Sequence, residues 1–212
     1  LTGLAEINRD SYGLYVNDDF SLVDNLILTL GTRYEKAEYD LHQRDRSAFP
    51  LAPLDETVTK SENAYTAGLT WLYSGKSALF GRYNRSFRFP LTDELVLFDY
   101  VAGRIRVNPD LKPQTGDHYE VGARHIFTPN LQANITFYRA EIKDEIFFNK
   151  ATFTNENYDQ TLHQGVEIGC RADLFERLTL FGNYAYEKAA FRDGPFDGKD
   201  IPAVPRLNLF LG

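Results

Sequence analysis

The side chains best suited to catalysis or metal binding in this sequence are four histidines and one cysteine. None of the histidines forms a pair at the spacing by which a helix presents two imidazoles to a metal, and the sequence has no nucleophile elbow or phosphate-binding loop. Cys170 occupies an apolar strand position, where a packed or lipid-facing side chain is expected rather than a reactive thiol. The loop carboxylates Asp93 and Glu94 are expected on a solvated face. We therefore predict no enzyme, no metal site and no cofactor. The histidines are His42, His118, His125 and His163.

A second group of candidate residues lies in a long predicted loop, residues 88–114. Its arginines provide permanently charged, bidentate donors for an anionic ligand, and its aromatic rings provide flat faces for stacking. We predict that these residues bind a ligand. In the alternative, the rings pack within the loop and the arginines pair with Asp99, Asp110 or the phosphates of lipopolysaccharide. The four residues are Phe98, Tyr100, Arg104 and Arg106.

The composition limits what kind of protein this is. The 212 residues carry a net charge of −7 and no block of basic residues, which argues against nucleic-acid binding. A single cysteine excludes an intramolecular disulfide framework, and no run of 18 apolar residues predicts a transmembrane helix. Methionine is absent, even at position 1, and the last residues alternate like a strand that stops. We expect an internal segment of a longer protein.

Alternation with a period of two residues runs through most of the chain and predicts antiparallel strands. Tight turns are predicted near residues 24, 75, 129 and 176, and they alternate with long loops. Short turns at one end and long loops at the other are typical of a transmembrane up-and-down β-barrel. Eight strands and a shorter ninth are predicted, at 11–20, 26–39, 65–73, 79–87, 118–127, 131–148, 160–174, 178–187 and 206–211. The long loops are predicted at 40–60, 88–114, 149–159 and 191–204.

The two faces of the predicted strands differ in chemistry. One carries leucine, valine and alanine near the strand middles and aromatic residues towards the ends, as lipid-facing barrel surfaces do. The other carries glycine, asparagine and threonine with isolated arginine and glutamate, which suits a filled lumen. Leu28, Trp71, Ile135 and Leu180 are therefore expected to point outward. A soluble β-sandwich, with a dry core between two sheets, is the alternative. The charged residues predicted to face the lumen are Arg33, Glu120, Arg124, Glu167 and Arg171.

Several phrases within these strands carry a family resemblance that covers residues 11–212. Their order resembles the β-barrel of TonB-dependent outer-membrane receptors. Gln114 stands where that family more often has glutamate. Haem receptors of the family carry a histidine ligand between two of these phrases, and none stands between Phe87 and Asn108, which argues against haem. The phrases are Leu30–Glu35, Tyr83–Pro90, Asn108–Pro113, Tyr119–Gly122, Gly165–Glu167 and Ile201–Arg206.

The resemblance implies a barrel of about 22 strands with a plugged lumen. Nine or ten strands cannot close such a barrel, so we expect residues 1–212 to be a partial β-barrel domain that lacks the plug and the C-terminal strands. The implied protein lies in the outer membrane of a Gram-negative bacterium and takes up a ferric siderophore or similar iron chelate with energy from the TonB complex. Its implied partners are the chelate, its own plug domain, the TonB complex and outer-membrane lipid. The five lumen-facing residues would then contact the plug or form cross-strand ladders.

Three alternatives stay open at this point. The first is a receptor of the same family for cobalamin or an oligosaccharide. The second is a complete passive or adhesive barrel of eight to ten strands, in which the first and last strands would pair. The third is the soluble sandwich.

Overall fold

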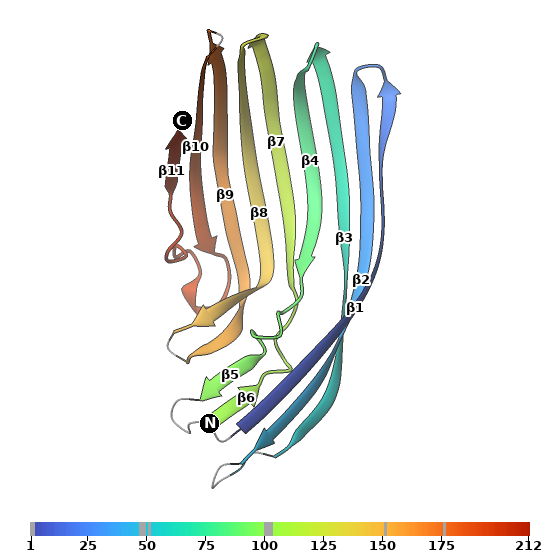
Figure 1. Cartoon of the computed structure of the whole chain (residues 1–212), viewed down its shortest axis with the longest axis vertical. Coiled ribbons are helices and arrows are strands. Elements are labelled where there is room, and N and C mark those ends of the chain that lie inside the picture. Colours follow the sequence, from blue (N-terminus) through green and yellow to red (C-terminus); the bar gives the residue numbers. More distant parts are fainter. Residues whose placement is uncertain (1–2, 47–49, 51, 100–103, 151, 176) are drawn as a thin grey trace.

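The computed structural model describes residues 3–46, 50, 52–99, 104–150, 152–175 and 177–212. Its main feature is one antiparallel sheet of nine strands, each lying beside its neighbour in the sequence, in the order β1-β2-β3-β4-β7-β8-β9-β10-β11 (Figure 1). The predicted all-β, up-and-down arrangement is confirmed. The strands are β1 (Gly3–Val23), β2 (Leu26–Asp45), β3 (Leu54–Ser74), β4 (Ser77–Arg88), β7 (Gln114–Thr128), β8 (Leu131–Asn149), β9 (Thr154–Leu174), β10 (Leu178–Phe191) and β11 (Leu207–Leu211).

The strands are joined by tight turns at one end of the sheet, shown at the top of Figure 1. Two of these turns use a left-handed backbone, at Gly75 with φ 52° and at Phe175 with φ 58°. Glycine adopts this conformation freely, whereas phenylalanine adopts it at a cost. The remaining connections lie at the opposite end, as predicted for a transmembrane barrel.

Two predicted loops are shorter than expected because the strands continue into them. The predicted bounds of the 40–60 loop are wrong, because β2 ends at Asp45 and β3 begins at Leu54. Tyr39, Leu41 and Gln43 continue the alternation of β2 and are buried. The 149–159 loop is likewise wrong, because β9 begins at Thr154, directly opposite Asn149.

The other two predicted loops contain ordered elements. Within 88–114, strands β5 (Val96–Asp99) and β6 (Arg104–Val107) form a separate two-stranded sheet. Within 191–204, a short 3₁₀ helix, η1 (Gly194–Phe196), follows β10, and Asp200 then forms a bridge with Ala190. Strand β11 pairs with β10 from Leu207 onward.

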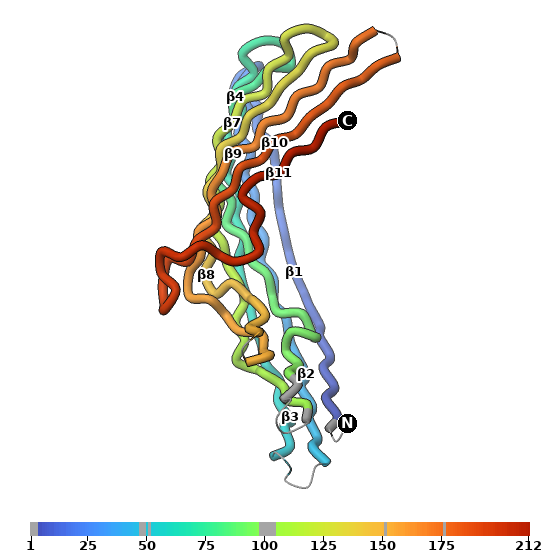
Figure 2. Tube along the Cα trace, turned by 90° about the vertical axis from the view of Figure 1, so that its left-hand side faces the viewer, coloured from blue at the N-terminus to red at the C-terminus, as the bar shows by residue number. Residues whose placement is uncertain are grey.

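The sheet is a single curved layer with a concave and a convex face, and β1 and β11 are its two edges (Figure 2). The described strands do not form the closed ring that a complete small barrel would require. They also do not form two packed sheets, because the large apolar side chains of the convex face are uncovered: Trp71 is 46% exposed and Leu180 is 47% exposed. Among the described residues, no helix has the length and apolar character needed to cross a membrane.

The convex face is banded. Its middle is aliphatic, with Leu28 paired to Leu69 and Ile135 paired to Ile168. Aromatic residues lie towards both ends of this band, as in the girdles of membrane barrels. One exception is Asp18, which the register places opposite Leu30 on the same face. The aromatic residues are Trp71, Tyr73 and Phe127 near the tight turns and Tyr34, Tyr65, Tyr83, Tyr119 and Tyr186 at the other end.

A row of charged side chains follows the second aromatic group on the convex face. Arg85 lies 3.5 Å from Asp117, and Arg139 pairs with Glu141. Lys188 continues the row on β10, because in the strand register Arg139 lies opposite Gln164, and Gln164 lies opposite Lys188. Charged groups are costly in hydrocarbon, so this row marks the outer limit of the lipid-facing band. We expect the strand ends beyond this row to project out of the membrane.

Candidate functional site on the concave face

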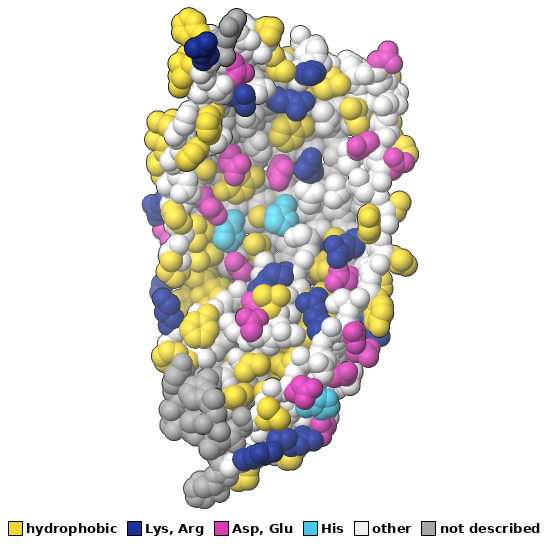
Figure 3. Space-filling model, in the orientation of Figure 1, with side chains coloured by type: hydrophobic (Ala, Val, Ile, Leu, Met, Phe, Trp, Pro, Cys, Tyr) yellow, Lys and Arg dark blue, Asp and Glu magenta, His cyan; other side chains and the backbone are white. Residues whose placement is uncertain are grey.

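The register places all five charged residues predicted for the lumen on the concave face. Arg33 shares its alternation with Tyr39, which contacts the loop folded inside the arc. Register then carries this face from β4 to β7, where Arg82 lies opposite Glu120, and from β8 to β9, where Thr136 lies opposite Glu167. Arg124 and Arg171 alternate with Glu120 and Glu167. Figure 3 shows the concave face as a hollow lined by charged side chains and histidines.

The contacts of these five residues are not those of a cross-strand ladder of ion pairs. Arg33 pairs with Glu35 and Arg171 with Asp173, each two residues along the same strand. Arg124 donates to the Lys76 carbonyl at 3.1 Å. Within the part of the chain that the structure describes, Glu120 and Glu167 have no cationic partner. The concave face therefore carries carboxylates that remain available to a partner inside the arc.

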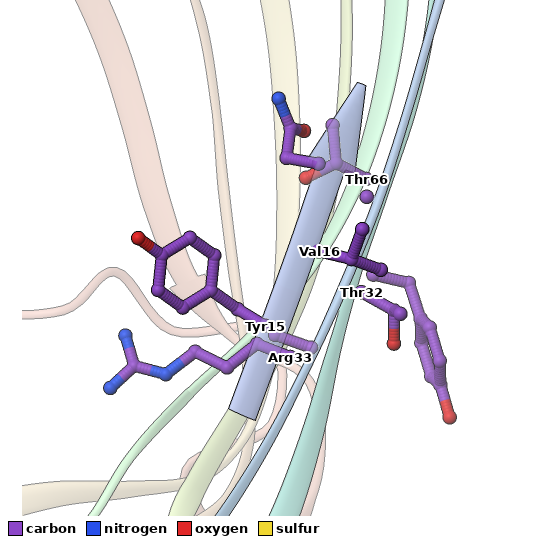
Figure 4. A pocket seen from close by; sticks show the side chains of 9 residues that line it. Tyr15, Val16, Thr32, Arg33 and Thr66 are labelled. Atoms are coloured by element: carbon purple, nitrogen blue, oxygen red, sulfur yellow. The ribbon is translucent and has the colours of Figure 1, made fainter. Parts of the chain in front are cut away.

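Two shallow hollows illustrate this surface. One, of about 380 Å³, is lined on the concave face by Arg82, His118, Glu120 and Glu167. The other, of about 330 Å³, lies beside the edge strand β1. Figure 4 shows how side chains alternate there, with Tyr15 and Arg33 extending to one side of β1 and Val16 and Thr32 to the other.

Three of the four residues predicted to bind a ligand lie on strands β5 and β6. The backbone of this hairpin pairs Phe98 with Ile105, and Asp99 with Arg104. Arg106 is exposed and lies opposite Leu97. Tyr100 lies outside the described residues. The hairpin thus brings three of the four positions onto one small sheet, and their ligand-binding role stays a prediction.

This hairpin belongs to a longer segment, residues 89–99 and 104–113, which we call the strap. The strap folds onto the concave face and encloses an apolar core with the inner side of β2. Leu95 is 1% exposed, and Tyr39 is fully buried against the strap. Burying such a side chain contributes about 1.5–3 kcal/mol. The core consists of Ala37, Tyr39, Leu41, Phe89, Leu95 and Leu111.

Polar contacts attach the strap to both sides of the arc. On β2, the Tyr39 hydroxyl donates to the Pro90 carbonyl at 2.7 Å, and the Gln43 side chain accepts from the Val107 amide at 2.7 Å. On β9, the side-chain amide of Asn155 donates to the Glu94 carbonyl at 3.0 Å. Asn157 both accepts from the Lys112 amide and donates to its carbonyl, at 2.9 and 3.1 Å. Sequence reasoning missed these contacts, and the continued alternation of Tyr39, Leu41 and Gln43 was the available signal.

A charged cluster joins β8, β9 and β10 on the concave face, beyond the lipid-facing band. His163 Nδ1 lies 3.0 Å from a Glu187 carboxylate oxygen, and its Nε2 lies 3.5 Å from Glu145. The second distance is an ion-pair contact without a well-formed hydrogen bond. The carboxylates of Glu145 and Glu187 raise the pKa of His163 above its ordinary value of 6.5, against the opposing effect of burial. The side chains come from three strands, so no sequence spacing revealed the cluster.

We expect His163→Gln to destabilise the protein more at pH 6 than at pH 9. The pKa of His163 is higher in the folded state, so its charge stabilises the fold fully below about pH 6.5 and the contribution is lost as the pH rises through the folded pKa. Thermal unfolding midpoints of the full-length protein at the two pH values measure the difference. His118→Gln is the matched control, because His118 contacts the Ser86 hydroxyl rather than a carboxylate. An equal loss at both pH values for His163→Gln would contradict the assignment.

Comparison with known proteins identifies a family and several relatives. Residues 3–212 match the family described as TonB dependent receptor-like, beta-barrel. A ferric-pyoverdine BN7/BN8 receptor from Pseudomonas putida is 23% identical over 209 residues, covering 95% of this chain and 24% of the relative. A ferrioxamine receptor from Yersinia enterocolitica is 24% identical over 207 residues, covering 93% of this chain and 26% of the relative.

Solved structures share the fold. The ferric yersiniabactin uptake receptor FyuA from Yersinia pestis superposes with a TM-score of 0.78 at 14% identity, over 98% of this chain and 31% of that structure. The copper transporter OprC gives a TM-score of 0.78 at 18% identity, over 96% and 31%. The chain thus spans 24–31% of the length of these proteins. It belongs to the TonB-dependent receptor β-barrel family, whose members are outer-membrane proteins of Gram-negative bacteria.

Proposed function

We propose that this chain is part of the barrel wall of a receptor for the energy-coupled uptake of a ferric siderophore or a similar iron chelate. The observation that supports this most is the family match over residues 3–212, together with relatives named as ferric-pyoverdine and ferrioxamine receptors. The relatives and structural neighbours named here are receptors and transporters. The strands form a curved wall, and the long connections lie at one end of it.

The concave face is where the receptor's own plug domain would lie. Glu120 and Glu167 have no cationic partner among the described side chains, and Arg82 lies directly opposite Glu120 in the register. Basic plug side chains would pair with the two carboxylates, and acidic ones with Arg82. The plug would in turn contact the TonB complex, which supplies the energy for transport. The convex face would contact outer-membrane lipid.

Uptake by the full-length receptor tests the proposed ligand class. A strain that lacks the parent gene would be complemented with the full-length gene and supplied with ⁵⁵Fe-labelled ferrioxamine, ferric pyoverdine or a ferric catecholate. We expect gene-dependent and TonB-dependent accumulation of iron from at least one of them. Cobalamin and a maltooligosaccharide form the second arm. Uptake of either of these, without uptake of any iron chelate, would replace the proposed ligand class with one of the alternatives.

The double substitution Arg104→Ala/Arg106→Ala tests the proposed ligand contact. Two guanidinium groups facing an anionic chelate would each contribute charge-assisted hydrogen bonds, so we expect affinity to fall by about tenfold or more. Equilibrium binding of the transported chelate to the purified full-length receptor measures this. Arg85→Ala is the matched control, because Arg85 lies on the convex face beside Asp117. Unchanged affinity in the double variant would remove these arginines from the site.

A further inference from the structure

We propose that the strap is a fixed part of the barrel wall, and that it keeps its position while ligand is bound and released. Whether the strap moves is independent of which ligand is transported, so this inference goes beyond the proposed function. Long extracellular connections are ordinarily the mobile parts of a protein. In this chain the described residues of the longest connection between wall strands are instead anchored at several points.

The strap is held on opposite sides of the arc. Strand β6 contacts β1 and β2, whereas β5 contacts β9. The two ends of the strap continue into β4 and β7, which are paired with each other. Figure 1 shows the hairpin lying across the space between the lower parts of β1 and β9. A swing about either side would therefore break the contacts on the other side.

The hydrogen bonds that hold the strap are made to its backbone. Gln43 and Asn157 bond to backbone groups of the strap, at Val107 and Lys112. Gln43 is itself 5% exposed, so its amide is placed by the surrounding wall. These contacts fix the path of the strap backbone rather than the rotamer of one side chain. Lys60 adds a contact from β3, because its ammonium donates to the Pro109 carbonyl at 3.3 Å.

Buried apolar residues lie beneath the strap. The core beneath the strap unites side chains from β2 and from both ends of the strap, including Leu41, Leu95 and Leu111. Lifting the strap would expose all of them to water at once. Segments that open readily have few buried apolar contacts and solvent-exposed backbone hydrogen bonds. The strap has the opposite properties, and it would present Arg106 from a rigid base.

Hydrogen exchange on the full-length receptor in detergent tests the proposal without any ligand. The amides of Val107, Asn108 and Lys112 donate to Gln43, Leu95 and Asn157. We expect them to exchange within about tenfold of the rates of the β7–β8 wall amides. The double variant Gln43→Ala/Asn157→Ala should raise the strap rates by about tenfold or more and leave the wall rates unchanged. Strap amides that exchange in the native receptor as fast as an open loop would overturn the proposal.

Cross-linking tests the same point during transport. In a cysteine-free receptor, which includes Cys170→Ala, Lys60→Cys and Asp110→Cys would be joined by a short bismaleimide after assembly in the membrane. Lys36→Cys and Ser61→Cys, register partners on the wall, form the control pair. We expect uptake of a transported ⁵⁵Fe chelate to stay within about twofold of the unlinked receptor. Loss of uptake in the linked strap pair alone would overturn the proposal. The exchange result remains valid even if no chelate in the panel is transported, so failure of the proposed function is separable.

Discussion

Replacing Leu95 with alanine is expected to weaken the attachment of the strap by about 2–5 kcal/mol. Leu95 is 1% exposed and lies in the core between the strap and β2, and its carbonyl accepts a hydrogen bond from the Asn108 amide at 2.8 Å. The substitution removes several buried methyl and methylene groups and leaves a cavity that the surrounding strands can fill only in part. The barrel wall itself should remain intact, because the nine-stranded ladder does not include Leu95.

Leu91 provides a control for this prediction within the same segment. It is the same residue type four positions earlier, but it is 50% exposed. Leu91→Ala should change stability by no more than about 0.5 kcal/mol. Exchange of the Asn108 amide in the full-length receptor measures both variants. Equal acceleration in the two variants, or none in Leu95→Ala, would show that the buried core does not hold the strap.

The wall of the barrel was predictable because a two-residue period assigns every strand residue to one face. Leu28 and Trp71 point outward for this reason, and Arg33 and Glu120 lie on the concave face. Turn chemistry placed the tight turns, as at Gly75. Strand ends were harder to place. Beyond Tyr39 the outward residues of β2 become polar, which resembles a loop, although the inward residues Leu41 and Gln43 stay buried.

The strap and the His163 cluster could not be predicted from the sequence, because their contacts join segments that are distant along the chain. Tyr39 meets Pro90, and Gln43 meets Val107, only after a connection of some 25 residues folds back inside the arc. Local pattern predicted a loop there, since Pro90 and Pro109 interrupt the alternation. The apolar run around Leu95 was a usable signal of burial. It did not identify the wall strand against which that run would pack.

The outward assignment of the apolar face leads to the second large effect, at Leu69. This side chain lies midway along the apolar run of β3, from Tyr65 to Tyr73, and is 45% exposed on the convex face. In a water-soluble protein, lysine at so exposed a position would cost little. In a bilayer, lysine near the midplane of a barrel's lipid-facing surface costs about 2–4 kcal/mol. We therefore expect Leu69→Lys to lower the free energy of unfolding of the full-length receptor in lipid vesicles by that amount.

Thr70→Lys is the matched control, because the next residue of β3 points to the concave face, opposite Ile27 and Phe80 in the register. A lysine there can extend into the polar lumen, so its cost should stay near or below about 1 kcal/mol. Folding of each variant into vesicles, followed as a function of urea concentration, gives the two free energies. A larger cost at Thr70 than at Leu69 would reverse the faces of the wall. It would show that the face of Thr70, rather than the face of Leu69, is removed from water, because lysine destabilises whichever face is removed from water.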